Sequence, residues 1–201
     1  MWRDDAGEAT GYVSYHSMRE HTPPMPVSRV WVREFVAIEG AAYQGLLRYI
    51  LSHDLADEIF WFGPVEDPLA YAVDDSYQVK REYVDDLMLR VVDVEKAVEA
   101  RPAAPGAPEG ALTVAISDAA APWNQGAWRI ESSGGKLSAR KDGGAAHLSM
   151  EEATFAAVYD GFMKATDAVR SGLAEAADHN AALMADRIFA SEYPPNGSDF
   201  F

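Results

Sequence analysis

The apolar residues in the first half of the chain follow strand-like and then helix-like spacings. Residues 11–16 alternate like a strand, residues 30–38 form another, and a proline-rich turn at 22–26 separates them. We therefore expect two antiparallel strands. The segment 41–53 repeats large apolar residues at i, i+3, i+4, i+7 and i+8, which predicts an amphipathic helix. These residues are Tyr43, Leu46, Leu47, Ile50 and Leu51.

The stretch that joins the two halves is predicted to be a strand that turns directly into a helix. An aromatic-rich strand at 59–62 and a loop or short helix from Asp67 precede it. Leu87–Val92 is a run of large apolar residues bounded by acidic ones, which is typical of a largely buried strand. Asp93 can cap the following helix, and Glu95 places negative charge in its first turn.

The second half begins with a proline-rich segment and continues as strands. Residues 102–110 have the composition of a linker or long turn. Strands are expected at 112–116, 128–131 and 136–140. The Gly-Gly pair within Ser132–Gly135 can supply the positive φ angles of a hairpin between the last two strands.

Helices are expected to follow these strands. Ser149 and Glu152 form a capping-box pattern, and Asp160–Gly161 indicates the end of the helix behind it. A short helix is expected at 165–170, and Asp178 is expected to cap a last one. The expected apolar faces carry Phe155, Val158, Tyr159 and Phe162 in the first helix and Leu183, Met184, Ile188 and Phe189 in the last. Strands followed by helices predict an α+β fold class, with a sheet covered on one face.

Composition narrows the classes of function. The 201 residues are 48% apolar and 24% charged, as in soluble globular proteins. The formal net charge of -15 argues against nucleic acid and anionic membrane partners. An acidic surface either attracts cationic small molecules or serves solubility alone. Cysteine is absent, which excludes disulfides, thiolate metal sites and a cysteine nucleophile. With no transmembrane-length apolar run and an acidic N-terminus, the expected location is cytoplasmic.

Three stretches of the sequence resemble one protein family. They are DDLMLRVVDVEKAVEAR at 85–101, SDAAAPWNQGAWRIE at 117–131, and the two phenylalanines at the chain end. They resemble the C-terminal part of the enhanced intracellular survival (Eis-like) family. Its members look like N-acetyltransferases built from two acetyltransferase-like (GNAT) domains and a third, sterol-carrier-protein-like (SCP2-like) domain. The resemblance extends from Gly11 to Phe201.

This resemblance implies a division of the chain. Residues 1–101 would form an incomplete second, non-catalytic acetyltransferase-like domain with a partial mixed sheet and helices. Residues 102–110 would be a linker, and residues 111–201 an SCP2-like sheet covered by helices. The partner would be the missing N-terminal acetyltransferase domain.

The sequence offers no good site for the diphosphate of coenzyme A (CoA). Acetyltransferases of this superfamily use Arg or Gln, two residues, Gly, one residue, then Gly or Ala, before a helix that holds the pyrophosphate. At the start of the strong helix, the position three residues before Gly40 is not Arg or Gln, and Glu39 adds a negative charge. Arg140–Ala145 fits the pattern, but a short pattern is common by chance, and a surface hairpin turn is favoured there. No cofactor-binding residue is therefore assigned.

The chain end is the one candidate catalytic group. Two terminal phenylalanines favour a docked end, and burial raises the pKa of a carboxylate towards values useful for a general base. The resemblance implies that the carboxylate of Phe201 removes a proton from the attacking amine in the complete enzyme. A terminal phenylalanine that only packs is the alternative.

The resemblance also implies the reaction and the assembly. Acetyl would pass from acetyl-CoA, as co-substrate, to a cationic amine of the aminoglycoside or lysine type, and family members form hexamers. This chain would supply scaffold and carboxylate and would be inactive alone. The alternative function is a lipid-binding or scaffolding SCP2-like module without catalysis.

The remaining chemically capable residues indicate structural roles. No pair of the histidines His16, His21, His53, His147 and His179 has the helical i, i+4 spacing of a zinc site, so no metal site is assigned. The aromatic residues Trp123, Trp128, Phe155, Phe162 and Phe189 are expected to lie in the core rather than around a lipid. Trp123-Asn124 followed by Gly126 is interpreted as a structural signature.

Overall fold

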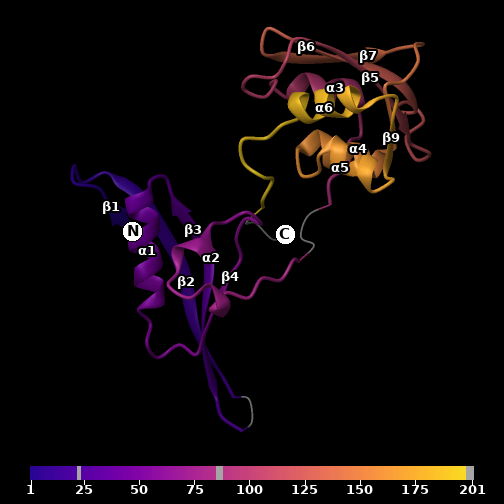
Figure 1. Ribbon diagram of the computed structural model, residues 1–201. Helices are drawn as coiled ribbons and strands as arrows, with labels where there is room; N and C mark the ends of the chain where they lie inside the picture. The colour runs from indigo at the N-terminus through magenta and orange to yellow at the C-terminus, as the bar shows by residue number, and fades with distance from the viewer. Residues whose placement is uncertain (22–23, 85–87, 198–201) are drawn as a thin grey trace. The chain divides into compact units, whose positions relative to one another are not determined.

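The computed structural model describes residues 1–21, 24–84 and 88–197 (Figure 1). The chain divides into two compact units: Met1–Asp85, with which Asn196 and Gly197 group, and Asp86–Pro195. Each unit has its own sheet and core, so each is described separately. The mixed α+β class predicted from the sequence is confirmed.

The first unit is built on a four-stranded sheet in the order β1-β2-β3-β4. The strands are β1 (Trp2–Arg3), β2 (Ala9–Glu20), β3 (Val27–Ala37) and β4 (Glu58–Trp61). Strands β2 and β3 pair antiparallel, as predicted, whereas β3 and β4 pair parallel through the connecting helix α1 (Gly40–Leu51). The short α2 (Leu69–Ala72) and the 3₁₀ turn η1 (Ser76–Gln78) follow.

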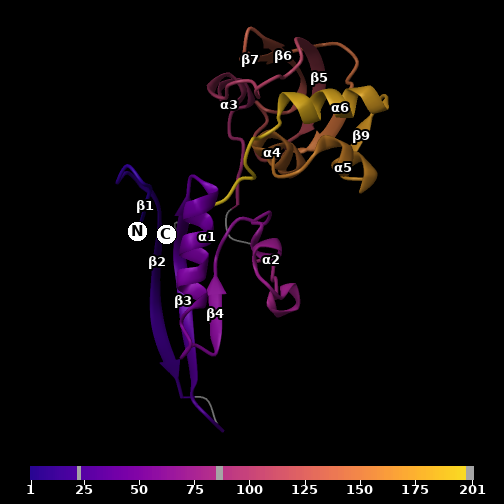
Figure 2. The same ribbon diagram turned by 60° about the vertical axis from the view of Figure 1, so that its left-hand side comes forward.

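Helix α1 covers one face of this sheet and runs along β2 and β3 (Figure 2). Val30 and Val32 of β3 and Ile50 of α1 form the fully buried centre of the contact. At Gly45 the helix approaches the Trp2 ring so closely that an added Cβ would overlap it. The predicted amphipathic helix is thus confirmed, and glycine at this position lets β1 close over it.

The predicted strand at 87–92 is wrong for its described part, Met88–Val92, which has no strand structure; Leu87 lies outside the described residues. Met88, Leu89 and Val92 are exposed, and only Val91 is buried. Side chains rather than a neighbouring strand bind its backbone. Trp123 Nε1 donates to Val92 O at 2.8 Å, and Asn124 Nδ2 donates to Val91 O at 3.1 Å.

Helix α3 (Val94–Ala100) follows as predicted and lies in the second unit. The Asp93 carboxylate accepts from Lys96 N at 3.1 Å, and Glu95 lies in the first turn. The helix packs against β7, and Pro102 bridges to Lys136 of that strand. The structural division at Asp85–Asp86 therefore falls earlier than the predicted boundary after residue 101, because residues 94–110 pack with the second sheet.

The second unit holds a five-stranded mixed sheet in the order β7-β6-β5-β8-β9. Its strands are β5 (Gly110–Ser117), β6 (Gly126–Ser133), β7 (Lys136–Lys141), β8 (Leu148–Glu151) and β9 (Ala174–Ala176). Only the pair β5–β8 is parallel. The β6–β7 hairpin turns on Gly134 and Gly135, whose φ angles of 58° and 75° confirm the Gly-Gly prediction.

Helices cover one face of this sheet, as predicted (Figure 1). With α3 they are α4 (Glu152–Asp160), α5 (Ala165–Arg170) and α6 (His179–Ile188). Helix α4 ends at Gly161 with φ 88°, and Asp178 caps α6 by accepting from Ala181 N. The capping-box prediction is wrong, because Ser149 lies in β8 and the first residue before α4, Glu151, makes no side-chain cap.

The core of the second unit confirms part of the expected aromatic set. Trp128, Phe155 and Phe189 are buried in one continuous cluster. Trp123 is 63% exposed and Phe162 is 65% exposed, so these two are not core residues. Helical spacing had placed Phe162 on the buried face of α4, but the helix ends at Gly161, and beyond that turn the spacing no longer applies.

Candidate functional site

The junction between β3 and α1 is where an acetyltransferase fold would place a pyrophosphate cradle. The first amides of α1 point out of the helix and favour an anion. Glu39 is the N-cap residue in an extended conformation, and its side chain makes no cap bond. Its carboxylate instead accepts from Thr10 Oγ1 at 2.6 Å, and its carbonyl accepts from Tyr43 N at 3.1 Å.

This geometry places a carboxylate beside the start of the helix. A Cβ added at Gly40 would meet no atom within 4 Å, so the approach to the backbone there is open. Glu39 is exposed and carries charge of the same sign as a diphosphate. A phosphate group brought to this helix start would meet Coulomb repulsion in addition to losing its hydration.

The second match to the cofactor pattern, Arg140–Ala145, lies where β7 ends. The Asp142 carboxylate closes the turn by accepting from Thr113 Oγ1 at 2.9 Å and from Gly144 N at 3.2 Å. The hydrogen bond from Thr113 is the main cause that lowers the pKa of Asp142 below 3.8. The next element is strand β8, so no helix N-terminus faces this loop. The loop is not the predicted hairpin either, since β7 and β8 are not neighbours.

A hydrogen-bonded group that sequence analysis missed joins α1 to β2. The Tyr15 and Tyr49 hydroxyls lie 2.7 Å apart, and His53 Nε2 lies 3.2 Å from the Tyr15 hydroxyl. His53 Nδ1 lies 3.0 Å from the Ile50 carbonyl, which can only accept, so Nδ1 donates this hydrogen bond. The hydrogen bond with Tyr49 raises the pKa of Tyr15. The i, i+4 spacing of Tyr49 and His53 was visible in the sequence, but their contact with Tyr15 was not.

Asn124 of the Trp123-Asn124 signature lies in a buried polar network, as the structural interpretation of that signature predicts. Asn124 Oδ1 accepts from Val94 N at 3.1 Å, and Asn124 Nδ2 donates to Asp118 at 3.3 Å. Arg90 Nη2 also donates to Asp118, at 2.6 Å. Burial alone would raise the pKa of Asp118, but these hydrogen bonds and one from Ala121 N outweigh it and lower that pKa. The network fixes the segment before α3.

The predicted catalytic group, Phe201, lies outside the described residues. The described path towards the chain end is held by Arg101, whose Nη2 donates to Phe189 O and Ala190 O at 3.0 Å each. Its guanidinium lies over the rings of Tyr159 and Phe189, at 5.5 and 5.8 Å from their centroids. Arg101 therefore fixes where the chain leaves α6.

The other histidines have structural contacts rather than metal partners. His147 Nδ1 accepts from Thr113 N at 3.0 Å, and His16 stacks on Trp31. Within residues 1–21, 24–84 and 88–197, no group of three His, Cys, Asp or Glu is arranged to hold a metal ion. In the same residues, no helix has both the length and the apolarity needed to cross a bilayer.

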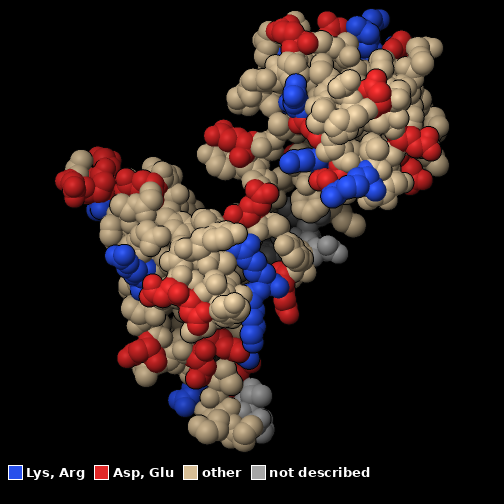
Figure 3. Space-filling view, in the orientation of Figure 1, with Lys and Arg blue, Asp and Glu red and all other residues tan. Residues whose placement is uncertain are grey.

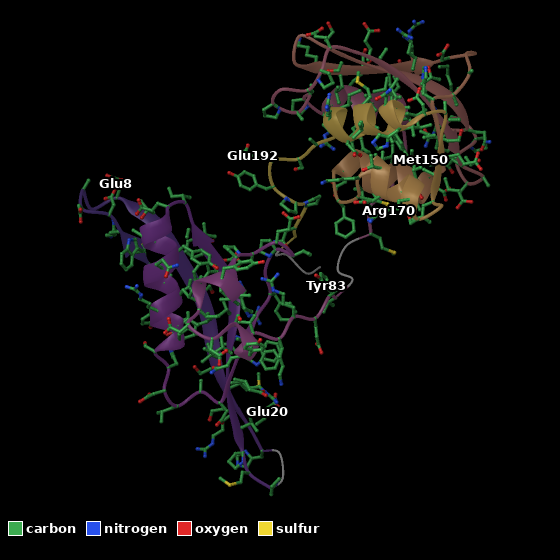
Figure 4. All side chains as sticks on the ribbon, in the orientation of Figure 1. Glu8, Glu20, Tyr83, Met150, Arg170 and Glu192 are labelled. Carbon is green, nitrogen blue, oxygen red and sulfur yellow. The ribbon has the colours of Figure 1, made fainter. Side chains whose placement is uncertain are left out.

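Two hollows lie on the second unit. One of about 210 Å³ is lined by Thr166, Val169, Ala176, Asp178, His179 and Ala182. The other, of about 570 Å³, is lined by Phe162, Met163, Asp167, Arg170 and Ser171; Figure 4 labels Arg170. Neither is lined by Trp128 or Phe155, which are enclosed in the packed core, and both include charged residues.

Comparison with known proteins gives each unit a family. Residues 1–91 match the family described as "Acetyltransferase (GNAT) domain", and residues 94–196 match the "Sterol carrier protein domain". An uncharacterized N-acetyltransferase of Streptomyces avermitilis is 25% identical over 190 residues, which are 94% of this chain and 46% of that protein. An uncharacterized N-acetyltransferase of Streptomyces coelicolor is 26% identical over 190 residues, which are 94% of this chain and 45% of that protein. The chain thus spans about half the length of these relatives.

Solved structures agree with this assignment. Eis1 from Mycobacterium abscessus has a TM-score of 0.76 and 27% identity, covering 98% of this chain and 52% of that chain. A GCN5-related N-acetyltransferase from Anabaena variabilis has a TM-score of 0.78 and 28% identity, and the match covers 92% of this chain and 46% of that chain. The chain therefore belongs to the sterol carrier protein domain family, with that domain joined to a domain of the GNAT acetyltransferase type.

Proposed function

We propose that this chain is the scaffold half of an N-acetyltransferase that transfers acetyl from acetyl-CoA to an amine. The GNAT family uses acetyl-CoA as co-substrate, and in our proposal a separate acetyltransferase domain binds it. The observation that carries the proposal is the Glu39 carboxylate, held by Thr10 beside the start of α1. A helix start with this charge beside it disfavours a diphosphate.

Calorimetric titration of the purified chain with acetyl-CoA tests this division of labour. We expect no saturable heat, because neither the β3–α1 junction nor the loop at Arg140 offers a phosphate cradle. Saturable binding in the micromolar range would contradict the proposal. In that event two variants would locate the site. Glu39→Arg adds a positive charge at the β3–α1 junction and should tighten binding there, whereas Arg140→Ala removes a positive charge from the loop after β7 and should weaken binding there.

The proposed chemical contribution of this chain is the carboxylate of Phe201, acting as general base on the attacking amine. Deleting Phe201 moves that carboxylate by one residue, whereas Phe201→Ala keeps it on the last residue. In the enzyme assembled with its acetyltransferase domain, we expect the deletion to lower kcat roughly 100-fold or more, as loss of a general base does. Phe201→Ala should retain most of kcat, and equal activity of the deletion and the native chain would contradict this role.

The proposed acceptor is a cationic amine of the aminoglycoside or lysine type. The net charge of -15 supports it, and Figure 3 shows Asp and Glu spread over the visible surface of both units. The proposed assembly is a homo-oligomer, a hexamer by resemblance. If electrostatic attraction brings the amine to the enzyme, KM should rise with salt while kcat changes little. A KM independent of salt would contradict this attraction.

Lipid binding is the second candidate function, and the sterol carrier protein match supports it. The packed interior around Trp128 and Phe155 argues against it. A thermal shift assay with fatty acids separates the two candidates. Stabilisation of the second unit that saturates with ligand would favour lipid carriage, whereas our proposal predicts none.

A further inference from the structure

The face of the first sheet opposite α1 carries a row of stacked aromatic side chains, which we call the aromatic row: His16, Trp31, Phe60 and Phe62. Trp31 is the register partner of His16 on β2 and of Phe60 on β4. Its ring centroid lies 4.5 Å from that of Phe60, 6.0 Å from that of Phe62 and 6.5 Å from that of His16. All three pairs are near parallel, so the rings form one stack across three segments.

The aromatic row is separate from the core under α1. Val30 and Val32, on either side of Trp31 in sequence, are buried in that core, so Trp31 projects from the other face. Phe60 is 38% exposed and Phe62 is 49% exposed. Among the described helices, α1 is the one whose contacts with several strands place it on this sheet, and it covers the face of the two valines.

Two observations indicate that a further layer covers the aromatic row. Its large apolar rings are grouped on one face of the sheet and stay partly exposed, and a contiguous exposed apolar patch usually marks an interaction site. Trp31 Nε1 is shielded from solvent yet donates to no acceptor among the described residues. Because buried donors are normally paired, the covering layer should bring an oxygen acceptor to this nitrogen.

The rim of the aromatic row is charged. Arg29 pairs with both Glu20 and Glu58 and places its guanidinium 5.5 Å from the Phe60 ring centroid. Glu20 is labelled in Figure 4, at the end of β2. At the other end, Glu34 accepts from the Tyr12 hydroxyl at 3.2 Å. Glu20 and Glu58 thus pair with Arg29 at one end of the row and Glu34 lies at the other, and an apolar centre inside a charged rim is the usual anatomy of a protein interface.

We infer that the aromatic row is the docking surface for an amphipathic helix from the acetyltransferase domain that the proposed function places on a separate part of the enzyme. The relatives are about twice as long as this chain and so contain polypeptide that could supply this layer. The helix presents apolar residues to the rings, an oxygen acceptor to Trp31 Nε1 and Lys or Arg to the acidic rim. A second copy of this chain fits less well, because symmetric pairing would bring together two sets of the rim carboxylates Glu20, Glu34 and Glu58.

Binding to the half of the Streptomyces coelicolor protein that this chain does not match tests the inference, without acetyl-CoA. The comparison uses the native chain, Phe60→Glu, Trp31→Phe and the control Tyr77→Glu, whose side chain lies in η1, is 95% exposed and is not part of the row. Hydrogen exchange of β3 amides checks that each variant folds. Biolayer interferometry should show saturable binding by the native chain, roughly tenfold or more weaker binding by Phe60→Glu, a smaller loss with Trp31→Phe, and no loss with Tyr77→Glu.

Equal binding by Phe60→Glu and the native chain would overturn the inference, as would no binding by the native chain. A native-chain dimer in sedimentation that Phe60→Glu abolishes would overturn it in favour of a second copy. The proposed function is tested separately by acetyl-CoA titration and by the Phe201 deletion, so failure of docking and failure of that proposal give different results.

Discussion

The two sheets of this chain differ in what their second faces display. In the first sheet, the cross-strand row opposite the helix is His16, Trp31 and Phe60. In the second, the row opposite the helices is the polar set Thr113, Arg129 and Arg140, which alternate with Val114, Ile130 and Ala139 of the core; Thr113 is itself buried. Both sheets are mostly antiparallel with one parallel pair, so strand direction does not distinguish them. The difference lies in the side chains, because a polar outer face can end in water, whereas a partly exposed aromatic face is typical of an interaction site.

The largest expected effect breaks the core of the second unit. Phe155 is 1% exposed at the centre of its cluster, so Phe155→Ala leaves a cavity and should cost about 3–5 kcal/mol. Phe162→Ala is the matched control, because that ring lies on the surface, and it should change stability by less than about 0.5 kcal/mol. Hydrogen exchange of β5 amides in increasing urea measures both free energies. Similar losses in both variants would contradict the assigned core.

The next effect tests whether the hydrogen bonds of Asn124 to the segment before α3 stabilise the second unit. Asn124→Ala removes the acceptor of Val94 N and the donor to Val91 O, both in buried positions. Unpaired buried groups should cost about 2–3 kcal/mol. The loss should appear in exchange of α3 and β5 amides and leave β3 amides of the first unit unchanged. An equal loss in both units would mean that their stabilities are coupled.

Acid should weaken the second unit through its depressed carboxyl groups. The pKa values of Asp93, Asp118 and Asp142 lie below 3.8 in the folded chain. Their stabilising contribution is therefore present above about pH 4 and is lost as pH falls through the folded-state pKa values. Asp118→Asn should make the loss of stability below pH 4 shallower, as measured by urea unfolding at several pH values. An unchanged slope would contradict a role for Asp118.

The smallest effect concerns the first unit. Tyr15→Phe removes the hydroxyl that links Tyr49 to His53, but those two groups lie near solvent and can bind water. A loss of about 0.5–1.5 kcal/mol is expected from β3 amide exchange. Tyr71→Phe, at a 91% exposed ring, is the control and should show none. A loss of unfolding free energy above about 3 kcal/mol would contradict the assignment of these hydroxyl and imidazole groups to positions near solvent.

Local signals in the sequence were enough for most elements. Alternation located β2 and β3, helical spacing located α1, and the Asp93 side chain marked the start of α3. Apolar content alone misled at Met88–Val92, where side chains from a loop far along the chain replace a strand partner. The capping-box pattern misled at Ser149 because that residue pairs with Ala115 of β5 before the helix begins.

The candidate site shows the same limit. The sequence located the β3–α1 junction and the negative charge of Glu39, but its hydrogen bond to Thr10 needed the strand and the helix to be in place. Tyr15, Tyr49 and His53 meet only because α1 folds back over β2. The role proposed for Phe201 came from resemblance, and that residue lies outside the described part of the chain.

The sequence by itself determined most of the secondary structure, because helix and strand signals depend on residues within a few positions of each other. Only the tertiary structure decided which faces are covered. Trp31 and Trp128 look alike as strand residues, yet one stands in an aromatic row partly open to solvent and the other is enclosed in a core. That difference depends on what packs above each strand, and contacts between distant segments fix it.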